Sequence, residues 1–269
     1  MTAAAEARPP ILVDIETSQR RNRLLFRLQF AAIWLAILLG LGFAFAATDN
    51  IDVAWIAEWA PLILGAAGIT IGVCLASIAL ATILALVSAI GRLSKNVVAN
   101  AVATFYVSLV RGTPLIVQIY IIYFALPQIS PALIFPAVVA GVLALGFNYG
   151  AYMTEIFRAG IQAVPRGQGE AANALGMPER LIFRRIVLPQ AVRIVTPAIG
   201  NEFIAMIKDS ALVSLLGVQE VLWRAENAGR PTRHTLEAFI IAALVYWALT
   251  MIFTYFQGKL EKRMSRGDR

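Results

Sequence analysis

The sequence is nearly free of cysteine and histidine, with one residue of each. Cys74 lies in an apolar run, and a lone cysteine excludes both a disulfide framework within the chain and a cysteine-based metal site. His234 has no neighbouring set of ligand residues, so we expect it to lie in a loop rather than at a metal. We therefore predict no metal centre in this chain.

Charged residues are scarce as well, at 14% of the chain, whereas hydrophobic residues make up 59%. Soluble domains are about one-quarter charged and about half apolar. A chain of 269 residues with this balance is typical of a membrane protein that crosses the bilayer several times. The net charge of +7 is therefore interpreted loop by loop, and we predict no nucleic-acid partner.

Motifs for nucleotide binding and catalysis are also missing. The only Gly-Lys pair, Gly258-Lys259, precedes Leu260, whereas a P-loop requires Ser or Thr at that place. We find no catalytic triad, nucleophile elbow or metal-ligand cluster in the sequence. We accordingly predict no catalytic residue and no cofactor in the chain, and a membrane enzyme is the function class with the least support.

Long apolar runs separated by polar turns predict an all-α protein with about six transmembrane helices. The expected spans are 24–47, 61–90, 96–126, 132–157, 189–216 and 236–256. Pro114 should kink or restart the third span, because it follows Arg111-Gly112-Thr113 inside an otherwise helical pattern. A short acidic loop with Asp49, Asp52 and Glu58 should follow the first span, and a polar loop is expected at 217–235.

Basic residues are distributed unevenly among these loops. They concentrate in the N-terminal tail 1–23, the turn 91–95, the central loop 159–188 and the C-terminal tail 259–269. The two short loops on the other side hold none, and the loop 217–235 holds only Arg224, Arg230 and Arg233. Because positively charged loops remain in the cytoplasm, we predict that both termini and the central loop are cytoplasmic.

The central loop contains a polar island, GQGEAANALGMPERLIFRRIVLPQ, at Gly167–Gln190. Glu170-Ala171-Ala172 should open a short helix of strong helix formers that Gly176 ends. Pro178 suits the first position of a second short helix, because its missing N–H costs nothing there. That second helix carries Glu179, Arg180, Arg184 and Arg185. An exposed helix, corner and helix of this kind is suited to docking into another protein.

The spacing of this island resembles the EAA loop of ABC importer permeases: Glu-Ala-Ala, three residues, Gly, nine residues, Ile-x-Leu-Pro. The matching positions are Glu170, Ala171, Ala172, Gly176, Ile186, Leu188 and Pro189. In that family the loop holds a coupling helix that fits a groove in the ATPase subunit; the alternative is an ordinary amphipathic loop. The resemblance implies that Glu170, Ala171, Ala172, Gly176, Met177, Pro178, Glu179, Arg180 and Arg184 contact the ATPase.

Two further stretches resemble the polar amino acid branch of these permeases, SLVRGTPLIVQIYIIYFALP at 108–127 and NEFIAMIKDSALVSLLG at 201–217. With FRAGIQAVPRG at 157–167, the resemblance covers about residues 61–258, the five-helix core of a type I importer. Residues 24–60 look like an additional N-terminal helix with an external loop.

This resemblance implies a multi-pass permease subunit that moves polar amino acids across the bacterial inner membrane. Its implied partners are a dimer of ATP-binding subunits that hold ATP and Mg, an extracytoplasmic amino-acid-binding protein, and a second permease subunit, identical or homologous. An ion-gradient-driven secondary transporter is the alternative, although we find no clear internal repeat and few carboxylates at membrane depth.

Charged residues at membrane depth are the first candidates for substrate contact, because such groups line a pathway or pair with one another. A free amino acid needs acceptors for its ammonium group and donors for its carboxylate. We predict that Glu202 is a substrate-side carboxylate, with an interhelix hydrogen bond as the alternative. Lys208 and Asp209 are further candidates, although as sequence neighbours they do not share a helix face and structural ion pairs are the alternative.

Neutral side chains complete the predicted substrate site. Asn148, Tyr149 and Gln118 can supply hydrogen bonds to a ligand, or alternatively bridge neighbouring helices. Glu155 and Arg158 are spaced three apart, which favours a structural ion pair near the cytoplasmic end of the fourth span.

Overall fold

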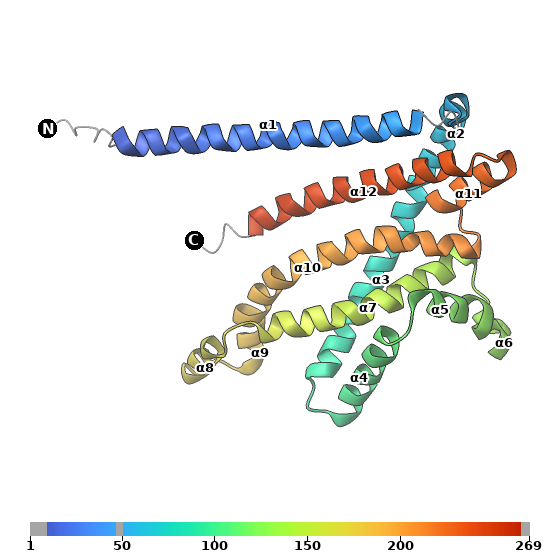
Figure 1. The fold of residues 1–269 in the computed structure, drawn as a ribbon. Helices are drawn as coiled ribbons and strands as arrows, with labels where there is room; N and C mark the ends of the chain where they lie inside the picture. Colours follow the sequence, from blue (N-terminus) through green and yellow to red (C-terminus); the bar gives the residue numbers. More distant parts are fainter. Residues whose placement is uncertain (1–9, 47–50, 265–269) are drawn as a thin grey trace. The chain divides into compact units, whose positions relative to one another are not determined.

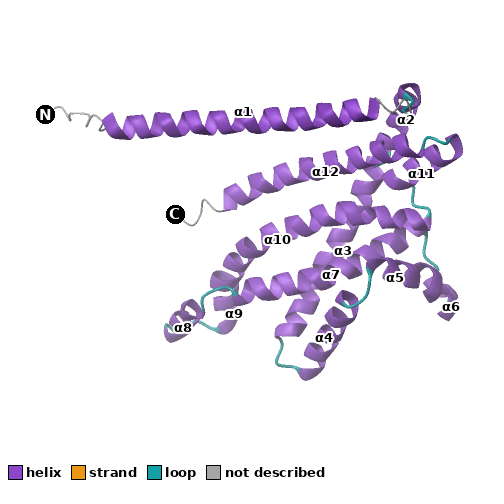
Figure 2. Cartoon of the chain, viewed as in Figure 1, coloured by secondary structure: helices purple, strands orange, loops and turns teal. Residues whose placement is uncertain are grey.

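The structure is a computed structural model that describes residues 10–46 and 51–264. Its described residues form helices joined by short turns and include no strand, which confirms the all-α expectation (Figures 1 and 2). The chain divides into two compact units, residues 1–53 and 54–269.

The first unit contains a single long helix, α1 (Pro10–Ala46), of 37 residues. Its residues 18–40 are apolar enough to cross a bilayer, and its described side chains are all exposed. Residues 10–23 of the expected tail are helical and continue into the apolar segment, because no helix breaker separates the two. The cytoplasmic position of the tail 1–23 stays a prediction. Asp49 of the expected acidic loop lies outside the described residues.

The second unit begins within α2 (Val53–Gly65), and α2 and α3 (Ala67–Leu93) together make one candidate span of 41 residues. The expected span 61–90 therefore starts too late, and Glu58 lies in a helix rather than in a loop. Asn96 then caps α4 (Val97–Arg111), since its side chain accepts a hydrogen bond from the N–H of Ala99 over 3.1 Å.

The interruption predicted at Pro114 is confirmed, and the helix axis changes direction strongly there. Pro114 precedes α5 (Leu115–Tyr120), which continues through a π-helical turn (Ile121–Ala125) into α6 (Leu126–Ile129). The axis of Leu115–Ile129 is bent by 107° from that of α4, so the pair forms either a broken span or a re-entrant loop. A 3₁₀ turn (Pro131–Leu133) leads to the next helix.

Helix α7 (Ala137–Gln162) occupies the centre of the second unit and packs against α3, α4 and α10. It begins later than the expected span 132–157, because Pro131 and Pro136 keep the preceding segment out of α-helix. Gly146 lies at its contact with α3, where an added Cβ would lie 2.6 Å from Leu80 Cδ2. Small residues at this contact let the two helix backbones approach closely.

The central loop folds as the predicted helix, corner and helix. It consists of α8 (Arg166–Ala174), α9 (Glu179–Ile182) and a π-helical turn (Phe183–Val187), and in Figure 1 it lies at one end of the unit. The first helix starts before Glu170, directly after Pro165. Gly176 has a φ of +81°, which confirms its predicted role as the residue that ends this helix.

The last part of the chain contains α10 (Leu188–Asp209), a 3₁₀ segment (Ser210–Leu216), α11 (Val221–Thr232) and α12 (Thr235–Met264). Figure 1 shows α7, α10 and α12 running side by side, and α11 at the end opposite to α8 and α9. The expected polar connection at 217–235 contains a helix in its middle, α11, which packs against α12.

By length and composition, four helical stretches of the described residues can cross a membrane. The number is five if α4 and the bent segment Leu115–Ile129 together form one further span. The expected fifth span, α10, is not among them, although its 22 residues extend about 33 Å. Arg193, Glu202 and Lys208 lower its hydropathy. Such a helix fits a membrane protein when its polar side faces protein or water.

Candidate functional site

A polar cavity of about 340 Å³ lies where the break after α4 meets α7 and α10. It is lined by Thr113, Pro114, Leu115, Asn148, Tyr149, Tyr152, Glu202 and Asp209. In the following text these eight residues are called the polar pocket. The polar lining distinguishes this cavity from a neighbouring one between Ile121, Leu126 and Phe147, which is lined almost entirely by apolar side chains.

Helix periodicity places the side chains of the polar pocket. Tyr152 follows Asn148 by four positions on α7, so both lie on the face of α7 that lines the pocket. Glu202 and Asp209 are seven positions apart on α10, which places them on one face two turns apart. The backbone at Thr113 reaches the cavity because the chain leaves its helical path there.

A hydrogen bond joins the two helices inside the pocket. The Tyr149 hydroxyl donates to Asp209 Oδ2 over 2.8 Å, and Tyr149 is itself almost completely buried. Asp209 was predicted either as a ligand-binding residue or as a member of a structural ion pair. It lines the cavity and accepts from a tyrosine, so one of its oxygens is held in place by a neutral partner.

Gln118 supports the pocket from behind and does not line it. Its amide nitrogen donates to the backbone oxygens of Val110 and Thr113 over 2.8 and 3.1 Å and to the Thr113 hydroxyl over 2.9 Å. Its oxygen accepts from the Asn148 amide over 3.1 Å. Gln118 therefore fixes both the broken backbone and the orientation of Asn148. This arrangement corresponds to the alternative given in the sequence analysis, in which Gln118 bridges neighbouring helices.

The charges of the pocket are predominantly negative. Glu202 and Asp209 repel each other, whereas Arg111 interacts favourably with Glu202. The Arg111 guanidinium lies 5.2 Å from the centre of the Tyr152 ring, a cation–π contact at the edge of the cavity. Lys208 is exposed and does not line the pocket, because it is rotated about 100° around α10 from its neighbour Asp209.

The structure thus brings together four of the predicted substrate residues, namely Asn148, Tyr149, Glu202 and Asp209. It adds Tyr152 and the turn at Thr113–Leu115, which sequence reasoning did not assign to the site. The spacing of four residues between Asn148 and Tyr152, which places both on one helix face, could have identified Tyr152 as a pocket residue from the sequence.

The helix–corner–helix of the central loop presents an exposed surface. Glu170, Glu179, Arg180 and Arg184 are all exposed, whereas Ala172 and Ile182 are buried. The corner is closed by two hydrogen bonds, from Gly176 N to Asn173 O over 2.9 Å and from Met177 N to Ala172 O over 3.1 Å. Beside it, Leu175 is 84% exposed, which leaves a large apolar side chain free to contact another protein.

The expected ion pair of Glu155 and Arg158 is confirmed, with 2.7 Å between the carboxylate and the guanidinium. Arg92 at the end of α3 joins it, 3.1 Å from the other oxygen of Glu155. His234 lies in the turn between α11 and α12, as predicted, and its ring stacks on Trp55 at 5.1 Å. Among the described residues, no group of three or more His, Cys, Asp or Glu is arranged to hold a metal ion.

Comparison with known proteins identifies similar chains. Residues 77–266 match the family described as the binding-protein-dependent transport system inner membrane component. The chain is 39% identical over 219 residues to an arginine transport system permease protein of Bacillus subtilis (strain 168), covering 81% of this chain and 100% of that protein. It is 39% identical over 196 residues to a putative glutamine transport system permease protein of Rickettsia typhi, covering 73% and 89%.

Solved structures show the same fold. An amino acid ABC transporter crystallised with histidines superposes with a TM-score of 0.75 and 36% identity, over 79% of this chain and 99% of that one. An inward-facing methionine ABC transporter superposes with a TM-score of 0.56 and 13% identity, over 80% and 99%, which is a likeness of fold alone.

Proposed function

Because this chain belongs to the family of binding-protein-dependent transport system inner membrane components, we propose that it imports amino acids with a positively charged side chain. It is the membrane-spanning permease subunit of an ATP-binding cassette importer for polar amino acids, not an ion-gradient-driven transporter. Its own contribution is a pathway for the substrate and a surface for the subunit that uses ATP.

The observation that carries this proposal is the pair of carboxylates, Glu202 and Asp209, in the polar pocket. An amino acid such as arginine carries two cationic groups and one carboxylate. The pocket offers two carboxylates, and Arg111 at its edge supplies one cation. Charge-assisted hydrogen bonds between such groups are about twice as strong as neutral ones. Sequence identity does not separate the candidate substrates, because the arginine permease of Bacillus subtilis and the putative glutamine permease of Rickettsia typhi are both 39% identical to this chain.

Size also fits. A cavity of about 340 Å³ is at the small end of ligand pockets, which range from about 300 to about 1,000 Å³. Asn148 supplies a neutral amide beside the carboxylates, and the ring of Tyr152 already holds the Arg111 guanidinium at the edge of the cavity. A neutral side chain such as that of glutamine would leave one half-buried carboxylate of the pocket without a cationic partner, which costs binding free energy.

The coupling part of the proposal rests on the exposed helix–corner–helix at 166–187. We expect a dimer of ATP-binding subunits, with ATP and Mg, to receive this surface through Leu175, Glu179, Arg180 and Arg184. A second permease subunit, identical or homologous, would complete the pathway, and an extracytoplasmic amino-acid-binding protein would deliver the substrate. The basic residues of the same side support a cytoplasmic position for this surface and for both termini.

The proposal is tested by uptake into proteoliposomes that contain the complex with its ATP-binding subunit and its binding protein. We expect ATP-dependent uptake of arginine, lysine or histidine, and little uptake of glutamine or glutamate. In the Glu202→Gln variant, uptake of the cationic amino acid should fall about ten- to a hundredfold, because hydrogen bonds to charged groups contribute about 1.5–3 kcal/mol. The matched control is Lys208→Gln on the same helix, which should retain uptake. Equal transport of glutamine and arginine would contradict the proposal.

A further inference from the structure

A groove of about 500 Å³ runs along the contact between α3 and α4 and ends on α7. The side chains that line it are apolar except for those of Ser88 and Tyr106. Val87, Val98 and Val102 of this lining are 64–71% exposed. In a chain that spans a membrane, such a surface lies against acyl chains or against another apolar helix, and the polar groups of the groove decide between these two.

One polar atom of the groove lacks a partner. Ser88 is only 7% exposed, and its hydroxyl makes no hydrogen bond to any residue that the structure describes. The other hydroxyl of the groove differs, because that of Tyr106 donates to the Phe147 backbone oxygen over 2.7 Å. A buried hydroxyl without a partner destabilises the fold, so Ser88 requires an acceptor from the molecule that fills the groove. The side chains of an apolar helix offer no such acceptor.

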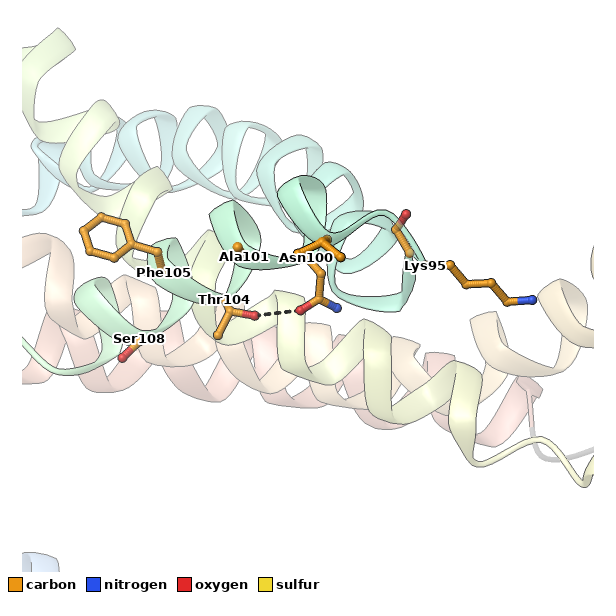
Figure 3. Close-up of a pocket in the computed structure, with 8 residues that line it drawn as sticks. Lys95, Asn100, Ala101, Thr104, Phe105 and Ser108 are labelled. Carbon is orange, nitrogen blue, oxygen red and sulfur yellow. Dashed lines mark hydrogen bonds between the residues drawn. The ribbon is translucent and has the colours of Figure 1, made fainter.

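One end of the groove lies at the basic turn between the two helices. Gly91 and Val98 line this end, and Lys95 lies between them in the chain. Figure 3 shows Lys95 extending beyond the start of α4, with its ammonium group pointing away from the helix. The start of α4 adds the partial positive charge of a helix N-terminus. An anionic group can therefore bind at this end of the groove.

The remaining charges near the turn leave it positive. The Glu155 carboxylate is paired with both Arg92 and Arg158, at 3.1 and 2.7 Å. Two guanidinium groups thus outweigh one carboxylate, and Lys95 adds a further positive charge. The turn is also held in place, because the backbone oxygen of Arg92 accepts a hydrogen bond from the Asn100 amide over 2.7 Å. A fixed, positively charged turn is complementary to a phosphate group.

The spacing of these features matches the layout of a phospholipid. Ser88 lies about 5 Å along α3 from Gly91, and Leu84 lies about 6 Å farther from the turn. A phospholipid carries its ester carbonyls between the phosphate and the acyl chains, and a carbonyl oxygen accepts a hydrogen bond from a hydroxyl. The order of positive turn, unpaired hydroxyl and apolar groove is therefore the order of phosphate, ester and acyl chain.

We propose that the groove between α3 and α4 binds one phospholipid with an anionic headgroup. Its phosphate lies at the turn beside Lys95, and one of its ester carbonyls accepts the hydrogen bond of the Ser88 hydroxyl. One acyl chain lies along Leu84, Val102 and Phe147. Preference for an anionic lipid comes from the turn, because an acyl chain gains little by moving from the bilayer into an apolar groove. The site is independent of the amino acid that is transported.

Photo-crosslinking of the complex with its ATP-binding subunit, in phosphatidylcholine nanodiscs, tests the site. The two probes are phosphatidylglycerol and phosphatidylcholine, each with a diazirine in the same acyl chain. Mass spectrometry counts the adducts on residues 84–91 relative to those on the exposed face of α12, which reports the surrounding bilayer. We expect this ratio to be about fivefold higher for phosphatidylglycerol, the factor for one lysine near an anionic lipid. The choline ammonium is repelled by Lys95.

Three variants, each chosen for one part of the lipid, separate the contributions. Lys95→Gln should lower the phosphatidylglycerol ratio about fivefold, whereas Lys208→Gln on α10 should leave it unchanged. Ser88→Ala should lower the ratio of both probes alike, because both carry ester carbonyls. Val102→Trp fills the groove and should remove the adducts on residues 84–91. Ala101→Trp adds the same bulk on the other side of α4, where Figure 3 shows Ala101, and should retain them.

Equal ratios for the two probes would overturn the proposal, since they would describe ordinary bilayer lipid. Absence of adducts on residues 84–91 in the assembled complex would also overturn it and would indicate that a helix of another subunit covers the groove. An unchanged phosphatidylglycerol ratio in Lys95→Gln would exclude the turn as the headgroup site. Crosslinking needs no transported substrate, so a failure to import arginine would contradict only the proposed function.

Discussion

The Tyr149 hydroxyl and the Asp209 carboxylate lie 2.8 Å apart, and this single hydrogen bond connects the central helix α7 to the end of α10 inside the polar pocket. Sixty positions separate the two residues in the chain. The bond orients one oxygen of Asp209 toward α7 and leaves the carboxylate's remaining acceptor capacity for a ligand. Asp209 is therefore positioned before any substrate arrives.

Removal of this hydroxyl gives a first prediction. Tyr149→Phe keeps the buried ring and deletes the donor, so Asp209 loses its orienting partner. We expect the KM for uptake of a cationic amino acid to rise about fivefold, since a hydrogen bond of this kind contributes about 1 kcal/mol. Tyr106→Phe is the control, because Tyr106 donates to the Phe147 backbone oxygen outside the pocket. Unchanged KM in Tyr149→Phe would show that Asp209 needs no such support.

A second prediction concerns the corner of the central loop. Gly176→Ala places a Cβ at a φ of +81°, which costs about 1–2 kcal/mol. The corner should distort, and ATP hydrolysis should no longer be coupled to uptake. The measurement is the number of amino acids imported per ATP in proteoliposomes. Gly167→Ala in α8 has open space around it and a helical backbone, so it should behave as the unmodified chain. A normal ratio in Gly176→Ala would argue against a rigid corner.

The third prediction is a pH dependence of stability. Glu220, which caps α11, is fully buried, and this burial raises its pKa to about 7. It accepts hydrogen bonds from Trp223 N over 2.9 Å, from the Thr70 hydroxyl over 3.4 Å and from the Tyr246 hydroxyl. A raised pKa means that the folded chain binds the proton more tightly than the unfolded chain does. The stabilisation is complete below the unfolded pKa and is lost as the pH rises through about 7.

The thermal unfolding midpoint of the purified protein should therefore decrease as the pH is raised from about 5 to about 8. The loss of folding free energy due to Glu220 has an upper bound of about 3 kcal/mol. Glu220→Gln, which is neutral at every pH, should show a smaller fall. Its hydrogen-bond capacity remains, so the variant is expected to fold. Parallel curves for the two proteins would exclude Glu220 as the titrating group.

A fourth prediction tests the contact between α3 and α7. Gly146→Ala would bring a Cβ to 2.6 Å from Leu80 Cδ2, and overpacking of this kind costs about 1–3 kcal/mol. We expect a lower unfolding midpoint for this variant. Gly72→Ala in α3 meets nothing within 4 Å and improves helix propensity, so its midpoint should remain equal or rise. Equal midpoints for Gly146→Ala and the unmodified chain would show that the helices separate at little cost.

Local features of the chain were predictable because their causes are local. Gly176 and Pro178 act on their own backbone, so the helix–corner–helix at 166–187 followed from a few neighbouring residues. The break at Pro114 followed for the same reason, although its angle of 107° did not. The composition of the apolar runs identified a membrane protein. The predicted ends of the helices, however, differed from those in the structure by several residues.

The membership of the polar pocket was decided only by tertiary structure. Lys208 and Asp209 are neighbours in the chain, yet Asp209 lines the pocket and Lys208 does not. Gln118 supports the site from outside, whereas Tyr152 belongs to it. Apolar composition alone determined that these helices insert into a membrane, because burial in lipid depends on the sum over a segment. Which polar side chains meet depends on how each helix is rotated, and that rotation is set by side-chain packing between residues far apart in the chain, as at Gly146 and Leu80.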